Sequence, residues 1–167
     1  MIVVKKIGEE SIPAIQELAE LTWAVAYSAI LPPHQMAYML DLFYSTTALQ
    51  KQMQEGHQFI LVSGNNDAVG FASYSPKMKV DAKVYRLHKI YVHPIQQGKG
   101  LGKTLLDFII ADIKPSGATD LELNVNRSNK ALGFYQKMGF VITLEEDIDI
   151  GNGYFMNDYI MNLSLGV

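Results

Sequence analysis

Apolar positions recur along this chain with two spacings, and these spacings predict where its helices and strands lie. A spacing of three and four residues is helical and predicts helices over residues 11–27, 34–43, 45–55, 101–113 and 129–138. Alternating or β-branched runs are typical of strands and predict them at residues 2–4, 58–63, 68–74, 85–92, 121–125, 140–144 and 154–165. Polar connections are expected at residues 75–83 and 147–153. This order of elements favours a mixed sheet with helices on both faces.

The segment 85–113 combines a strand, a tight turn and a helix. The strand ends before Pro94, and Gly98, Gly100 and Gly102 follow at the start of the apolar helix. The N–H groups at a helix start and the positive end of the helix dipole attract anions, and glycines let a ligand approach the backbone closely. The segment therefore predicts a site for a phosphate-bearing cofactor.

Composition narrows the class of protein. The 167 residues suit one domain, and a hydrophobic share of 49% is enough for a sizeable core. A net charge of −3 gives no basic surface that argues for nucleic acid. The chain has no cysteine, which excludes disulfides, thiolate–zinc sites and a cysteine nucleophile. No apolar run approaches the roughly 20 residues of a membrane span, and the N-terminus is typical of a strand rather than a signal peptide, so we expect a cytoplasmic protein.

Two motifs together resemble the GNAT superfamily of acetyl-CoA-dependent N-acetyltransferases. The sequence QGKGLG at 97–102 is similar to the family's Q/R-x-x-G-x-G/A loop, and ALGFYQKMGF at 131–140 is similar to its A-x-x-F-Y-x-x-x-G-F helix and turn. The resemblance covers residues 58–140 well. It implies that residues 1–167 form a single GNAT-like domain of the α/β class (α+β by some schemes), with a mixed, mostly antiparallel sheet of about six or seven strands. The sequences KIYV (89–92) and DYIM (158–161) look most like the diamine and spermidine acetyltransferase branch.

The resemblance implies acetyl-CoA as cosubstrate, with no metal. The glycine loop would wrap the pyrophosphate, and the strand would bind the pantetheine arm through its backbone where it splays from its neighbour. One of Asn126, Ser128 and Asn129 should add a contact, and we expect Asn129, although the family often places asparagine at the position of Ser128. The expected cofactor-binding residues are Tyr91, Val92, Gln97, Gly98, Lys99, Gly100, Leu101, Gly102, Lys103 and Asn129.

Two residues are candidates for proton transfer. Tyr135 sits where the family places a tyrosine near the CoA sulfur, so the resemblance implies a general acid for the departing thiolate; a core aromatic residue is the alternative. His88 lies near the place where many relatives carry a glutamate and is the candidate general base. It alternates with Ile90 and Val92, so we expect it on their face of the strand. A structural histidine, or catalysis without a dedicated base, is the alternative.

The acceptor pocket is expected between the N-terminal helices and the C-terminal loop. Trp23 and Tyr27 lie four residues apart on one helix face, and Tyr38 follows in the next helix. Acidic residues cluster at 145–149, before the Gly151-Asn152-Gly153 turn. Aromatic and acidic groups together suit a cationic amine, whereas a core-facing stripe and a solvated acidic loop would need no ligand.

The sequence thus predicts an enzyme that transfers an acetyl group from acetyl-CoA to a primary amine by direct attack on the thioester. The acceptor would be a polyamine, another small amine or a protein amine, and a homodimer is common in the family. A GNAT-like domain that senses acyl-CoA without turnover is the first alternative, and Tyr135 favours the enzyme. A nucleotide-binding protein is disfavoured, because 97–102 lacks the G-K-[ST] ending of a P-loop.

Overall fold

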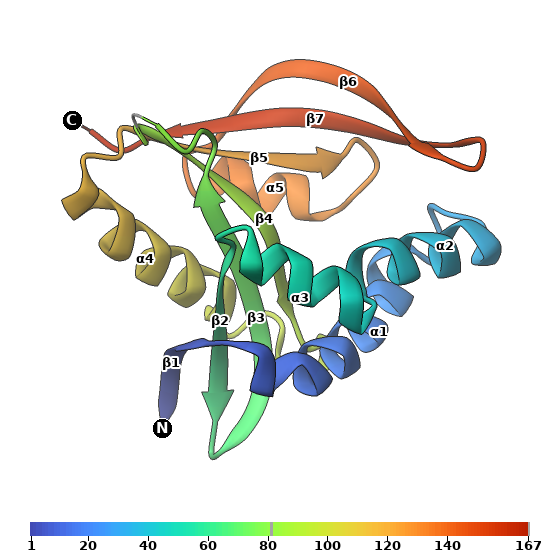
Figure 1. Ribbon diagram of the computed structural model, residues 1–167, viewed down its shortest axis with the longest axis horizontal. Helices are drawn as coiled ribbons and strands as arrows, with labels where there is room; N and C mark the ends of the chain where they lie inside the picture. The colour runs from blue at the N-terminus through green and yellow to red at the C-terminus, as the bar shows by residue number, and fades with distance from the viewer. Residues whose placement is uncertain (81, 167) are drawn as a thin grey trace.

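The computed structural model describes residues 1–80 and 82–166. Its strands form one seven-stranded sheet, on which the helices pack. The strands run in the order β1-β2-β3-β4-β5-β7-β6, and every neighbouring pair is antiparallel except β4 and β5 (Figure 1). This confirms the predicted mixed, mostly antiparallel sheet. The strands are β1 (Ile2–Ile7), β2 (Gln58–Gly64), β3 (Asp67–Pro76), β4 (Val84–Val92), β5 (Asp120–Asn126), β6 (Val141–Gly151) and β7 (Tyr154–Ser164).

Helices cover both faces of this sheet, as the sequence predicts. The helices are α1 (Ile12–Tyr27), α2 (Pro33–Tyr44), α3 (Thr46–Gln54), α4 (Leu101–Ile113) and α5 (Ala131–Lys137). α1, α2 and α3 form one apolar core with the sheet, while α4 and α5 form a second core on the opposite face. β2 supplies both cores, because Phe59 and Leu61 pack with α1 whereas Ile60 and Val62 pack with α4. A strand buried on both faces has an apolar run instead of a simple alternation.

β4 and β5 pair over only a short length. Their parallel register runs from Val84 opposite Asp120 to Leu87 opposite Leu123 and then stops, although both strands continue. Within the described residues, the edge of β4 beyond Leu87 that faces away from β3 therefore has no neighbouring strand. Its backbone N–H and C=O groups need another partner, which a ligand can supply.

A β-bulge in β4 reverses which side chains face which core. Ser73 of β3 lies opposite Lys89, and Tyr74 lies opposite Leu87, so His88 is the extra residue. Ile90 and Val92 pack with the α4 core, but His88 stacks on His57 on the other side. The expectation that His88 shares a face with Ile90 and Val92 is wrong, because an inserted residue breaks the period of two.

The last hairpin is longer than expected. β6 continues through Asp147 and Asp149 to Gly151, where residues 147–153 were expected to form a loop. Pairing with β7 keeps these acidic residues in a strand despite their low β-propensity. Residue 81 of the expected connection 75–83 and the final residue lie outside the described part. Among the described residues, no helix has both the length and the apolar composition needed to cross a membrane.

A substitution at Gly70 tests how closely β3 packs against its neighbouring strands. A Cβ at Gly70 would lie 2.9 Å from the carbonyl oxygen of Tyr91 and 2.9 Å from Val62 Cγ1. We expect Gly70→Ala to lower the free energy of unfolding by about 1–3 kcal/mol, as overpacking does in other cores. Chemical denaturation measures the change.

Gly133→Ala is the matched control for this substitution. Gly133 lies in α5, and a Cβ there would meet nothing within 4 Å. This variant should raise the free energy of unfolding by up to about 1 kcal/mol, which is the difference in helix propensity. A Gly70→Ala variant as stable as Gly133→Ala would contradict the close contact.

Candidate active site

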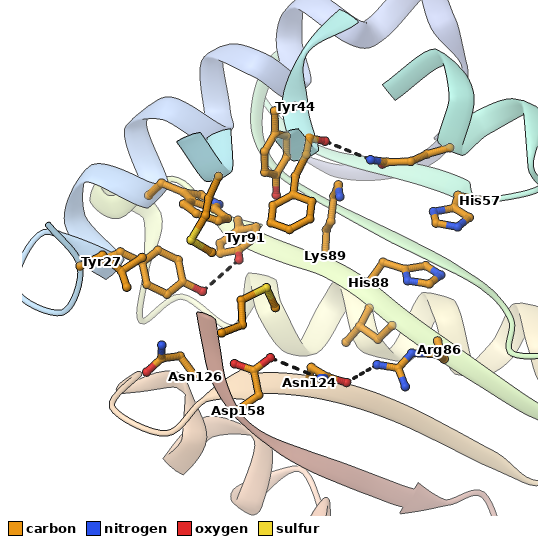
Figure 2. Close-up of a pocket in the computed structure, with 17 residues that line it drawn as sticks. Tyr27, Tyr44, His57, Arg86, His88, Lys89, Tyr91, Asn124, Asn126 and Asp158 are labelled. Carbon is orange, nitrogen blue, oxygen red and sulfur yellow. Dashed lines mark hydrogen bonds between the residues drawn. The ribbon is translucent and has the colours of Figure 1, made fainter. Parts of the chain in front are cut away.

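A cavity of about 360 Å³ lies where β4 and β5 separate. α1 and α2 form one wall, and β5 and β7 form the other, with β4 between them (Figure 2). The volume is within the range of small-molecule sites. The residues that line it with polar groups or aromatic rings are Trp23, Tyr27, Phe43, Tyr44, Gln52, His57, Arg86, His88, Lys89, Tyr91, Asn124, Asn126 and Asp158.

The glycine loop between β4 and α4 has the geometry of an anion site. Gly98 and Gly100 have φ values of 81° and 78°, which glycine adopts readily. A Cβ at either position would meet nothing within 4 Å, so the loop is open on its outer side. α4 begins at Leu101, and the N–H groups of its first turn have no acceptor within the helix. Gln97 braces the loop by donating from Nε2 to the carbonyl oxygen of Val92, at 3.1 Å.

The two lysines of this loop have intramolecular partners. Lys99 Nζ donates to Gln96 Oε1 at 3.0 Å, and Lys103 Nζ lies 2.7 Å from Asp107 Oδ2. Both side chains are exposed. Exposed pairs of this kind are weak, so either lysine can turn to a bound phosphate.

The two sequence motifs touch each other. A Cβ at Gly102 would lie 3.0 Å from Phe134 Cζ, so the glycine permits α5 to pack on the first turn of α4. The next residue, Tyr135, is buried, and its ring packs edge-on against Phe134 and Phe140. Burial raises the pKa of the Tyr135 hydroxyl, with a smaller contribution from Tyr27. The group therefore keeps its proton at neutral pH.

A small polar cluster joins α1, β4 and α5. The hydroxyls of Tyr27 and Tyr91 are 3.2 Å apart, and Asn129 Nδ2 donates to the Tyr27 hydroxyl at 3.3 Å. Asn129 Oδ1 also accepts the N–H of Ala131 at 2.9 Å, which caps the start of α5. Trp23 packs on Tyr27 with ring centroids 4.6 Å apart. Of the predicted residues, Trp23, Tyr27, Tyr91, Asn129 and Tyr135 are thus brought together.

His88 reaches the cavity through the bulge. Its ring stacks on His57 with centroids 3.9 Å apart and an interplanar angle of 1° (Figure 2). Its Nε2 lies 2.6 Å from Ser75 Oγ. Desolvation lowers the pKa of His88, and the charges of His57, Lys89 and Arg86 lower it further. The ring is therefore neutral at pH 7.

The sequence reasoning missed four ionisable residues of the cavity, His57, Arg86, Lys89 and Asp158, of which the last two are the most buried. Lys89 is only 9% exposed, and its ammonium lies 4.7 Å from the ring centroid of Tyr44. Asp158 is only 3% exposed and accepts a hydrogen bond from Asn124 Nδ2 at 3.3 Å. Burial raises the pKa of Asp158 and lowers that of Lys89 to about 8. Both residues lie inside predicted strands, 85–92 and 154–165, and a charged residue within a strand is the sequence signal that could have indicated them.

The remaining acceptor residues lie away from the cavity. Tyr38 does not line it; its hydroxyl donates to the carbonyl oxygen of Ile150 at 2.8 Å, which attaches α2 to the β6–β7 hairpin. Glu145 and Asp147 pair with Arg127 on the exposed edge strand β6. The acidic cluster is therefore a surface feature, and Asp158 is the carboxylate that lines the cavity.

Comparison with known proteins defines the class. The family described as "Acetyltransferase (GNAT) domain" matches residues 31–162, and the chain belongs to this family. It is 36% identical, over 52% of each chain, to the L-amino acid N-acyltransferase MnaT of Escherichia coli K12, so it spans about half the length of that relative. It is 26% identical to the spermidine N(1)-acetyltransferase of Thermoplasma acidophilum, over 92% of this chain and 94% of the relative.

A solved structure agrees with the arrangement of the elements. The PaiA N-acetyltransferase from Thermoplasma acidophilum, determined in complex with coenzyme A, superposes with a TM-score of 0.82 at 25% identity. The match covers 98% of this chain and 99% of that one. Resemblance to the GNAT superfamily and the fold are thereby confirmed.

Gly100→Glu tests the glycine loop as a cofactor site. The added carboxylate would occupy the open side of the loop and repel pyrophosphate, so we expect acetyl-CoA affinity to fall by at least about 100-fold, the loss of some 2.7 kcal/mol. Isothermal titration calorimetry measures it.

Gly117→Glu controls for backbone strain and charge in this experiment. Gly117 also has a positive φ, 90°, and an open side, but it lies beyond the other end of α4. The Gly117→Glu variant should bind acetyl-CoA with the affinity of the wild type. Similar affinities of both variants would show that the loop has been misassigned.

Proposed function

We propose that this protein transfers an acetyl group from acetyl-CoA to the nitrogen of an amine. The observation that carries this proposal is the contact between the glycine loop and the Tyr135 helix beside a cavity of small-molecule size. That contact supports a site in which the loop binds the anion and the Tyr135 hydroxyl lies close to it, although Tyr135 is not one of the residues that line the cavity. The GNAT family membership and the amine acceptors named for the relatives support the same reaction.

The residues fit acetyl-CoA as cosubstrate. The open outer side of Gly98 and Gly100, with the free N–H groups of α4, suits the pyrophosphate. Among the described residues, the edge of β4 beyond Leu87 has no neighbouring strand, and at Tyr91 and Val92 it suits the amide groups of the pantetheine arm, which would extend that edge like a strand. The Gln97 side chain that donates to the Val92 carbonyl oxygen would give up this bond to the arm. The full proposed set is Tyr91, Val92, Gln97, Gly98, Lys99, Gly100, Leu101, Gly102, Lys103 and Asn129.

The reaction requires two proton transfers, one to the departing CoA thiolate and one from the acceptor ammonium. The thioester supplies an activated carbonyl carbon; a C–N bond forms as the C–S bond breaks, and the thiolate leaves. Tyr135 is the proposed donor to that thiolate, supported by its place in the family motif; its raised pKa keeps the hydroxyl protonated but makes it a weaker acid than an exposed tyrosine. Trp23 and Tyr27 are proposed to hold the acceptor, and Tyr38 to act through the hairpin that it anchors.

The acceptor ammonium must lose a proton before it attacks. His88 is the proposed base, because its ring faces the cavity, although the lowering of its pKa makes it a weaker base than an ordinary histidine. A specific observation favours Asp158 as a second candidate: its carboxylate lines the same cavity, and burial raises its pKa, which makes it a stronger base than an exposed aspartate.

Tyr135→Phe tests the reaction and the general acid together. We expect the wild type to release free CoA thiol with at least one amine of a panel. The variant should lower kcat by about 10²- to 10⁴-fold, the usual contribution of a general acid, with acetyl-CoA affinity nearly unchanged. Tyr85→Phe removes a hydroxyl that contacts Ser116 instead and should behave like the wild type.

Two outcomes would count against this proposal. Wild-type turnover in Tyr135→Phe would remove Tyr135 from the mechanism. Tight acetyl-CoA binding without thiol release for any amine would leave an acyl-CoA sensor, the alternative function.

pH–rate profiles of His88→Ala and Asp158→Asn locate the base. Its loss should lower kcat/KM by about 10²-fold or more near pH 7. The deficit should shrink as the pH rises toward the pKa of the amine, because a neutral amine needs no base. We expect this pattern for His88→Ala; finding it in Asp158→Asn alone would transfer the role to Asp158.

A further inference from the structure

Lys89 is a buried cation without an anionic partner. It is 9% exposed, and its ammonium lies 4.7 Å from the ring centroid of Tyr44 and 5.8 Å from that of Phe43. In the described part of the chain, no carboxylate lies within 4.0 Å of its Nζ, and no side-chain hydrogen bond satisfies it. Burial alone lowers its pKa to about 8, so most molecules carry the charge at pH 7.

The other charged groups of the cavity are already engaged. Arg86 pairs with Glu122 and donates to Asn124, and Asp158 accepts from Asn124. Figure 2 shows Lys89 directed toward the α2 wall near Tyr44, and Asp158 on the opposite wall. The cavity therefore has a free positive group on one side and a carboxylate on the other.

Three further polar atoms of the cavity lack partners. Trp23 Nε1, Gln52 Oε1 and His57 Nδ1 are buried and make no hydrogen bond with any described residue. A buried polar atom without a partner is costly, and a buried charge without one is more so. A polyamine would bring additional positive charge to Lys89, whereas an anionic group would compensate it.

We propose that the acceptor amine also carries a carboxylate, which Lys89 binds, so that the substrate is an amino acid. This deepens the proposed function and rests on it. The ammonium of such a molecule faces Asp158 while its carboxylate faces Lys89, and the rings of Phe43 and Tyr44 accommodate an apolar side chain. The acceptor of a relative, the L-amino acid N-acyltransferase of Escherichia coli, has the same chemistry.

Matched pairs of amines test this proposal with the intact enzyme. L-leucine is compared with isopentylamine, and γ-aminobutyrate with butylamine, because each pair differs only by the carboxylate. Spermidine is the cationic comparison. Thiol release gives kcat/KM for each. We expect the carboxylated member of at least one pair to be preferred by about 10-fold or more, with spermidine poorer than either, since hydrogen bonds to charged groups contribute on this scale.

Lys89→Met removes the charge but keeps a flexible side chain of similar length. The preference for the carboxylated member should fall by about 10- to 100-fold, mainly through KM, and Lys89→Arg should restore part of it. Lys114→Met, at an exposed position beyond α4, is the matched control and should keep the wild-type preference. The melting temperature and acetyl-CoA affinity of Lys89→Met report whether the fold is retained.

The results separate this inference from the proposed function. Preference for the member without a carboxylate in both pairs or for spermidine, or an equal loss for both members in Lys89→Met, would overturn the amino acid proposal and leave N-acetyl transfer standing. Absence of turnover with every amine would overturn the proposed function, and the inference with it.

Discussion

β4 and β5 stop pairing after Leu87 and Leu123, and the arrangement of the site depends on this separation. A parallel pair needs a crossover connection, and here α4 supplies it between the glycine loop and β5. The two strands thus pair only over their first residues. Beyond them, the edge of β4 has no partner strand among the described residues. The same separation opens the cavity, with the loop at the end of β4 and α5 at the end of β5 (Figure 1).

The bulge at His88 has a second consequence for this site. Without the extra residue, Leu87, Lys89 and Tyr91 would lie on one face of β4. With it, Leu87 packs in the α4 core, while Lys89 and Tyr91 point to the α1 and α2 side. One inserted residue therefore converts an apolar strand into a surface that contributes a cation, a tyrosine hydroxyl and an imidazole to the cavity. Bulges occur often beside active sites for this reason.

Burial is the main electrostatic influence on the cavity. It raises the pKa of Tyr135 and Asp158 and lowers that of Lys89 and His88, in each case against the charged form. A ligand that replaces water here meets groups whose charges are weakly screened. Tyr135 keeps its proton at neutral pH, and Lys89 keeps most of its charge. The same desolvation thus influences the protonation state of both side chains.

Local patterns in the sequence determined the elements, the loop of Gly98 and Gly100 and the position of Tyr135, because helical periodicity, glycine turns and a long motif depend on neighbours in the chain. They were sufficient to predict the GNAT fold and to propose the glycine loop as the phosphate-binding segment. The cavity itself depended on contacts between residues far apart, such as His57 with His88 and Asp158 with Asn124. Only the tertiary structure decided that Lys89 has no counter-ion among residues 1–80 and 82–166, that the bulge turns His88 toward the cavity, and that the acidic residues of β6 lie outside it. Burial and strand register are properties of the assembled sheet, and no local pattern specifies them.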